Sequence, residues 1–119
     1  MSAHTELQIH KTGVQLLALV ADVQAVLPRT FRHYGNRVGQ EVTDLLVAIA
    51  RANAAKGAAR AAQIEHTLER LDVVQVMLRV AHDKRLISPK LWAQSAELTG
   101  SIGRQGGGWL KSSRSAPAA

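Results

Sequence analysis

Apolar residues recur every three or four positions along most of this chain, and only three prolines interrupt them. This spacing places apolar side chains on one face of an α-helix. Strand-like alternation of apolar and polar residues is absent from the sequence, and 119 residues fit one domain. The sequence therefore predicts an all-α fold, an antiparallel up-down four-helix bundle with short connections.

The first expected helix spans residues 6–27, and the second spans about residues 36–55. Their apolar stripes are Leu16, Val20, Val23 and Leu27 in the first, and Val38, Val42, Leu45, Leu46, Ile49 and Ala52 in the second. Residues 28–35 (PRTFRHYG) begin with proline and break the pattern, so we expect a loop. Gly57 should mark the turn into the third helix.

The third expected helix, about residues 58–84, carries two apolar stripes. The first consists of Ile64, Leu68, Leu71, Val74 and Leu78, and the second of Val73, Val76, Met77 and Val80. A helix in a solitary four-helix bundle needs one buried face. The second stripe therefore predicts a partner subunit.

The fourth helix has a clear start, with Ser88 as N-cap and Pro89 as the first helical residue. The triglycine of residues 106–108 should end it, and Trp109 with Leu110 should follow as an apolar plug. We expect the bundle to occupy residues 1–111 and residues 112–119 to form a disordered tail.

The sequence lacks the residues that several kinds of catalytic, metal and phosphate-binding sites require. Without cysteine there are no disulfides, thiolate metal sites or thiol nucleophiles. Gln63 and Arg79 stand three positions before His66 and His82, where a di-iron bundle has glutamate. Leu110 precedes Lys111, where a phosphate loop requires glycine. No serine-nucleophile motif occurs. We expect no catalytic activity, metal or cofactor.

The chain should also lie outside membranes, because no apolar run reaches the roughly 18 to 20 residues of a membrane span. Its first residues lack the features of a secretion signal, so we expect a cytoplasmic protein.

Charged residues on the third helix suggest ion pairs. Arg79 and Asp83 are four apart and interrupt stripes that we expect to be buried. A buried arginine must be paired or bind an anion, so an ion pair within the bundle is the main expectation and an anion or partner contact the alternative. Glu65 and Glu69 should lie on a solvated face, in salt bridges to Arg70 or to a neighbouring helix.

Fifteen lysines and arginines against nine acidic residues give a formal charge of +6. The basic residues gather around the expected connections, so both ends of an antiparallel bundle should be basic. Such a surface favours nucleic acid as a partner. The alternative is that the cations provide solubility and stabilise helix C-termini.

Several segments resemble the four-helix bundle proteins of the accessory variability determinant type, a group that includes proteins encoded in intervening sequences of 23S ribosomal RNA genes. The resemblance covers roughly residues 14–112. It rests most on Ser101-Ile102-Gly103-Arg104 and Gly107-Gly108-Trp109-Leu110-Lys111-Ser112, with support from Leu68-Glu69-Arg70-Leu71, Leu78-Arg79-Val80-Ala81, Leu86-Ile87-Ser88, Leu45-Leu46, Ala52-Asn53, Pro28, Arg32, Gly35 and Arg37. The chain departs from the family at Gln75, where an arginine is common, and at Gly100-Ser101, where an acid usually stands.

This resemblance implies a homopentameric barrel with a basic surface. Accessory variability determinants associate with the reverse transcriptase of a diversity-generating retroelement and assist mutagenic, RNA-templated cDNA synthesis. We expect contacts with reverse transcriptase, RNA and DNA from Arg29, Arg32, Arg37, Arg60, Arg79, Arg85, Arg104 and Lys111. The expected subunit interface comprises Val73, Val76, Met77, Val80 and Trp109. The alternative is a structural oligomer of the intervening-sequence type, without a nucleic-acid role.

Overall fold

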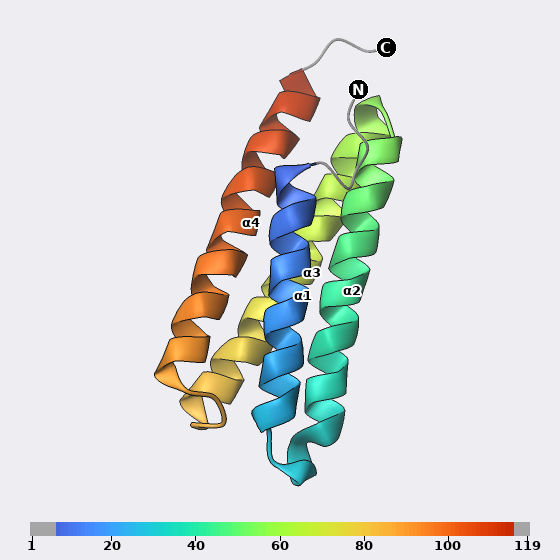
Figure 1. Cartoon of the computed structure of the whole chain (residues 1–119). Coiled ribbons are helices and arrows are strands. Elements are labelled where there is room, and N and C mark those ends of the chain that lie inside the picture. The colour runs from blue at the N-terminus through green and yellow to red at the C-terminus, as the bar shows by residue number, and fades with distance from the viewer. Residues whose placement is uncertain (1–6, 116–119) are drawn as a thin grey trace.

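Four long helices alternate in direction along residues 7–115, the part of the chain that the computed structural model describes (Figure 1). They are α1 (Gln8–Val26), α2 (Arg32–Ala54), α3 (Gly57–Asp83) and α4 (Pro89–Ser115), with a 3₁₀ turn, η2 (Arg29–Phe31), between α1 and α2. This part contains no strand, which confirms the predicted all-α class. None of its helices is long and apolar enough to cross a membrane.

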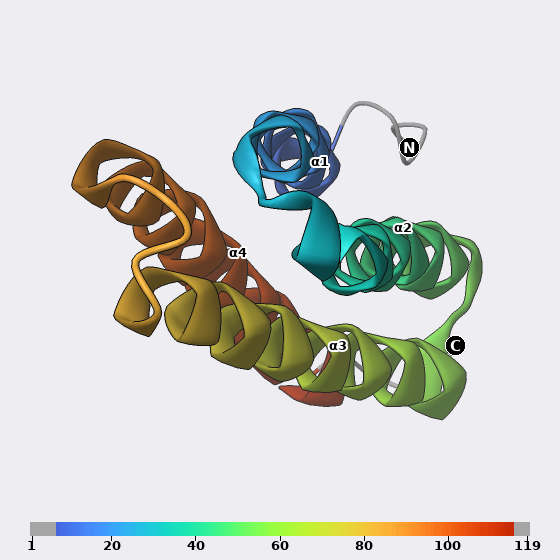
Figure 2. The same ribbon diagram turned by 90° about the horizontal axis from the view of Figure 1, so that it is seen from below.

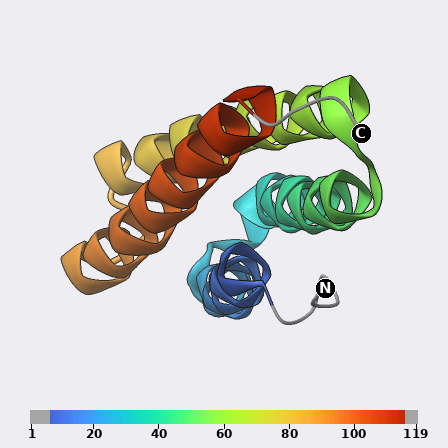
Figure 3. The same ribbon diagram turned by 90° about the horizontal axis from the view of Figure 1, so that it is seen from above.

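Each helix packs against two others, so the four surround one core. Helices α1 and α3 each contact both α2 and α4 (Figures 2 and 3). All four helices contribute fully buried side chains, among them Leu16, Val20, Leu45, Ile49, Ile64, Leu78 and Ile102. The core is therefore almost entirely aliphatic, as the low aromatic content of the chain requires.

The first apolar stripe is confirmed in α1, where Leu16, Val20 and Val23 are buried. Gly13 is buried as well, and a Cβ added there would lie 2.7 Å from the Leu46 side chain of α2. A glycine in this turn therefore allows α2 to approach closely. The predicted helix start at residue 6 lies outside the described residues.

The predicted loop at residues 28–35 is wrong in its second half, because α2 begins at Arg32. Pro28 accepts the backbone N–H of Phe31 (2.8 Å), which closes η2 and leads the chain directly into α2. Tyr34 then donates its hydroxyl to the Met77 carbonyl (2.6 Å), and Gly35 is buried against Leu27. These tertiary contacts extend the helix through a segment whose polar residues suggested a loop.

Both predicted apolar stripes lie on α3, but the first is more deeply buried than the second. Ile64, Leu71, Val74 and Leu78 are buried in the core, and Leu68 is half-buried. In the second stripe Val73, Val76 and Val80 are exposed, whereas Met77 packs against the core of its own chain. Gly57 has a φ of +59°, so it does mark the turn that precedes α3.

The predicted end of the fourth helix at residues 106–108 is wrong, because α4 continues through the triglycine to Ser115. The last two turns are held by other parts of the bundle. Trp109 packs against the core, Arg114 pairs with Glu65 of α3 (2.7 Å), and a Cβ at Gly106 would lie 2.8 Å from Leu68. Residues 112–115 are thus helical rather than part of a tail, and residues 116–119 lie outside the described residues.

Candidate nucleic-acid interface

Two connections meet at the lower end of the bundle, where α1 passes into α2 and α3 into α4 (Figure 1). The Lys84 ammonium lies 6.0 Å from the centre of the Phe31 ring, so the two connections are neighbours. Five cations are exposed at this end: Arg29, Arg32, Lys84, Arg85 and Lys90. The prediction of a basic bundle end is therefore confirmed here.

Arg29 and Arg32 also line a hollow of about 390 Å³ with the end of α1 and the start of α2. Arg85 lines a second hollow, of about 670 Å³, between the end of α3 and the start of α4. The three predicted binding residues at the lower end are thus accessible to a polyanion that approaches along the bundle axis.

The opposite, upper end holds Arg60 and Lys111, and their roles differ. Arg60 is half-buried, and its guanidinium donates to three backbone carbonyls at the end of α2: Ala52 (3.0 Å), Ala55 (2.9 Å) and Asn53 (2.9 Å). The Ala52 carbonyl also accepts the backbone N–H of Ala55 (3.3 Å), and the other two carbonyls lie at the helix end, where carbonyls lack partners within the helix. Arg60 therefore caps α2, whereas Lys111 is exposed on α4.

The remaining predicted cations lie along the sides of the bundle. Arg104 is exposed on α4. Arg79 pairs with Asp83 at 3.9 Å, and their side chains are 71% and 62% exposed. The expectation of a buried Arg79 is wrong, because this pair lies on the solvent side of α3 beside the exposed valines. A pair of this kind contributes about 0–1 kcal/mol.

Glu65 and Arg70 of α3 both form ion pairs with neighbouring helices. Glu65 bonds to Arg114 of α4, as expected for a bridge to a neighbouring helix. Arg70 bonds to Glu41 of α2 instead of to the acids of its own helix.

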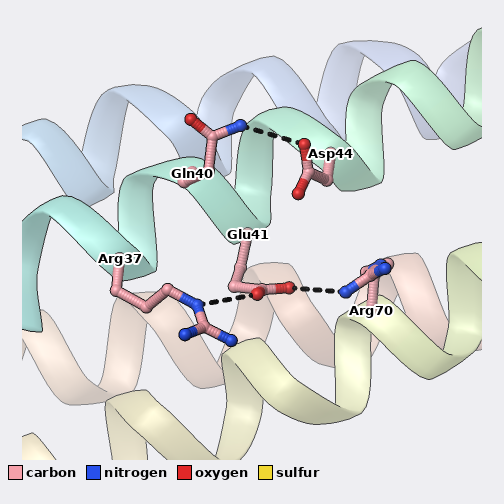
Figure 4. A network of polar contacts seen from close by, with 5 residues as sticks. All are labelled: Arg37, Gln40, Glu41, Asp44 and Arg70. Atoms are coloured by element: carbon pink, nitrogen blue, oxygen red, sulfur yellow. Dashed lines mark hydrogen bonds and ion pairs between the residues drawn. The ribbon is translucent and has the colours of Figure 1, made fainter.

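Glu41 is the one buried carboxylate among the described residues, and two arginines contact it (Figure 4). Its Oε2 accepts from Arg37 Nε at 3.0 Å, and its Oε1 accepts from Arg70 Nη1 at 3.3 Å. Sequence reasoning included Arg37 among the binding residues but missed Arg70 and Glu41. The signal was present, because Glu41 falls between Val38 and Val42 on the apolar stripe of α2, where an unpaired carboxylate is costly.

The exposed valines form a ridge on α3, at Val73, Val76 and Val80. Val76 is 63% exposed and borders a groove of about 310 Å³ that Trp92 and Ala96 of α4 also line. Trp109, the other predicted interface residue, is half-buried and packs against the core. The ridge and the groove give the molecule an unpartnered apolar side between α3 and α4.

Titratable groups within the described residues form no cluster of three or more that could hold a metal ion. His82 stacks on Trp92 with ring centres 4.8 Å apart, an arrangement that fixes the end of α3 against the start of α4. Burial raises the pKa of the Tyr34 phenol above its ordinary value, so this hydroxyl stays protonated and keeps its bond to Met77.

Comparison with protein-family models, with curated proteins and with solved structures finds no match to the chain.

Proposed function

We propose that this chain is a non-catalytic accessory protein of a diversity-generating retroelement, which binds the reverse transcriptase and the template RNA and its cDNA through a basic surface in the cytoplasm. We further propose that copies assemble as a homopentameric barrel. The observation that carries the proposal is the set of exposed cations at the lower end, which have no acidic partner within hydrogen-bonding distance in the described residues.

Charge and packing support the two halves of this proposal separately. A phosphate backbone is attracted by exposed lysines and arginines regardless of sequence, and an assembly multiplies the formal +6 of each copy. The apolar ridge of α3 supplies a surface that a second copy could bury. One segment that resembles accessory variability determinants contributes both to the core and to the charged surface, because Ile102 is buried while Arg104 is exposed.

The test is the salt dependence of RNA binding. The wild-type protein should bind a fluorescein-labelled single-stranded RNA with an affinity that falls steeply as salt rises. Replacing Arg29, Arg32 and Arg85 together with alanine should weaken binding and flatten the slope of log affinity against log salt by about 0.7 for each lost phosphate contact. A triple alanine variant at the side positions Gln15, Gln40 and Gln94 is the control, because it leaves the charge unchanged.

A second measurement separates this function from a purely structural one. When it is expressed with the reverse transcriptase of such a retroelement, the protein should copurify with that enzyme, and the triple arginine variant should be depleted from the complex. An intact oligomer that binds neither RNA nor reverse transcriptase would favour the structural alternative of the intervening-sequence type.

A further inference from the structure

The buried Glu41 carries one arginine on each of its two carboxylate oxygens (Figure 4). The Glu41 side chain is 4% exposed, while those of Arg37 and Arg70 are 63% and 36% exposed. The carboxylate therefore lies beneath the two guanidinium groups, between α2 and α3. One arginine would neutralise it, so the second leaves the cluster with a net charge of +1.

Each arginine also retains most of its hydrogen-bonding capacity. A guanidinium has five N–H donors. Arg37 donates Nε–H to Glu41, and Arg70 donates from Nη1. Both terminal nitrogens of Arg37, and Nε and Nη2 of Arg70, can bond to another acceptor. Planar guanidinium groups match the oxygens of phosphate in paired hydrogen bonds.

We propose that Arg37 and Arg70 form a binding site for a backbone phosphate of RNA, and that Glu41 is the residue that positions them. This inference rests on the nucleic-acid function proposed above. Glu41 holds both guanidinium groups against the same carboxylate before the ligand arrives, so less side-chain entropy is lost on binding. The site lies on the α2–α3 side of the bundle and extends the interface beyond the lower end.

A buried ion pair is not the arrangement that stability alone favours at this position. A buried ion pair costs desolvation energy, and apolar residues of similar volume often replace such a pair without loss of stability. Position 41 belongs to the apolar stripe of α2, between Val38 and Val42, where an aliphatic residue would fit the pattern. A carboxylate retained there is explained by the arginines that it orients.

The test compares two variants that change the net charge of the protein by the same amount. Glu41→Gln removes one negative charge, so if net charge alone governed affinity the variant would bind a fluorescein-labelled oligouridylate more tightly. With the proposed site, the freed arginines should lower affinity about three- to tenfold at constant salt. The matched control is Asp44→Asn, which makes the same charge change at the next turn of α2, where the carboxylate accepts from Gln40 (3.0 Å). This control should bind as tightly as the wild-type protein or more tightly.

A second pair of variants keeps the charge and changes only the shape of the donor. Arg70→Lys should weaken RNA binding about threefold or more, because an ammonium lacks the planar fork. Arg51→Lys, at an exposed position in the last turn of α2, should leave binding unchanged. Circular dichroism checks that each variant is folded, and Arg70→Lys decides the question if Glu41→Gln unfolds.

The outcomes separate the two proposals. If the wild-type protein binds RNA with a steep salt dependence but Glu41→Gln matches Asp44→Asn and Arg70→Lys matches Arg51→Lys, the phosphate site is wrong and the basic surface stands. If the wild-type protein does not bind RNA at all, both proposals are wrong.

Discussion

Two arginines at helix ends affect the stability of the fold in opposite ways. Arg60 stabilises the end of α2 through three hydrogen bonds, whereas Arg85 follows α3 with a φ of +59°. The backbone of Arg85 completes a capping motif, because its N–H donates to His82 and the next N–H, of Leu86, donates to Ala81. Glycine is the usual residue in this conformation, so a side chain there is retained at a cost to the fold.

Replacing Arg60 should therefore destabilise the protein. Arg60→Ala leaves three carbonyls at the end of α2 without the guanidinium, and we expect the free energy of unfolding to fall by about 2 kcal/mol. Urea denaturation followed by circular dichroism measures the change. Lys56→Ala, at an exposed cation near the same end, is the control and should cost no more than about 0.5 kcal/mol. Equal effects of the two variants would contradict the capping role of Arg60.

Replacing Arg85 with glycine should have the reverse effect on stability. Arg85→Gly removes the strain of a left-handed residue, and we expect the free energy of unfolding to rise by about 0.5–1 kcal/mol. Arg85→Ala removes the same charge but keeps the strained conformation. The difference in unfolding free energy between the two variants therefore measures the cost of that conformation. An Arg85→Gly variant no more stable than Arg85→Ala would show that the conformation costs nothing. Both variants should bind RNA less tightly than the wild-type protein if Arg85 contacts phosphate.

At the scale of helices, periodicity predicted the four elements and most of their ends, but not the start of α2 or the end of α4. The stripes of α1 and α2 are buried as predicted except for Leu27 and Leu46, which are half-buried, because aliphatic residues at helical spacing leave one way to form a core. The N-cap of α4 is also confirmed, since Ser88 Oγ accepts the N–H of Leu91 (3.1 Å). A helix cap of this kind involves residues within one turn of each other, so the local sequence is enough to predict it.

The errors arise where distant residues decide the outcome. Residues 106–108 look like a helix stop because three glycines have low helix propensity. The pairing of Arg114 with Glu65 and the packing of Trp109 hold α4 together beyond them, and neither contact can be read from neighbouring residues. The Glu41 cluster was missed for the same reason, because Arg70 lies 29 residues away on another helix.

The continuation of α4 can be tested at its open glycines. Gly107 and Gly108 are exposed in the helix, and a Cβ at either would meet no atom within 4 Å. The double variant Gly107→Ala/Gly108→Ala should raise the free energy of unfolding by about 1–2 kcal/mol and increase the helical signal. Thermal melting at 222 nm measures both.

Gly57→Ala is the control for this prediction, because Gly57 has a positive φ and alanine there should destabilise by about 1 kcal/mol. If α4 ended at the triglycine, the double variant would leave the melting temperature and the helical signal unchanged.

At the scale of the whole molecule, the valine ridge and the lower-end cations occupy different parts of the surface, and Arg79 is the cation that borders the ridge. The valine ridge of α3 faces away from the core beside α4, while the exposed cations Arg29, Arg32 and Lys90 gather at the lower end. A second copy could cover the ridge without burying those cations. An assembly built in this way would present several basic ends together. A polyanion that contacts more than one end would bind more tightly, because each contact after the first is made at a high effective concentration.

The last prediction concerns that assembly. Val76→Asp puts a charge at the most exposed large apolar position of the ridge. Because Val76 is 63% exposed within one chain, its replacement should change monomer stability by less than about 1 kcal/mol, yet burying the charge in a subunit interface would cost far more. Light scattering should therefore find oligomers for the wild-type protein and 12.8 kDa particles for the variant. Val26→Asp makes the same change at a 54% exposed position at the end of α1, away from the ridge, and should leave the oligomer intact. A wild-type protein that is monomeric at working concentration would contradict the role of the ridge, and dissociation by both variants would contradict its position.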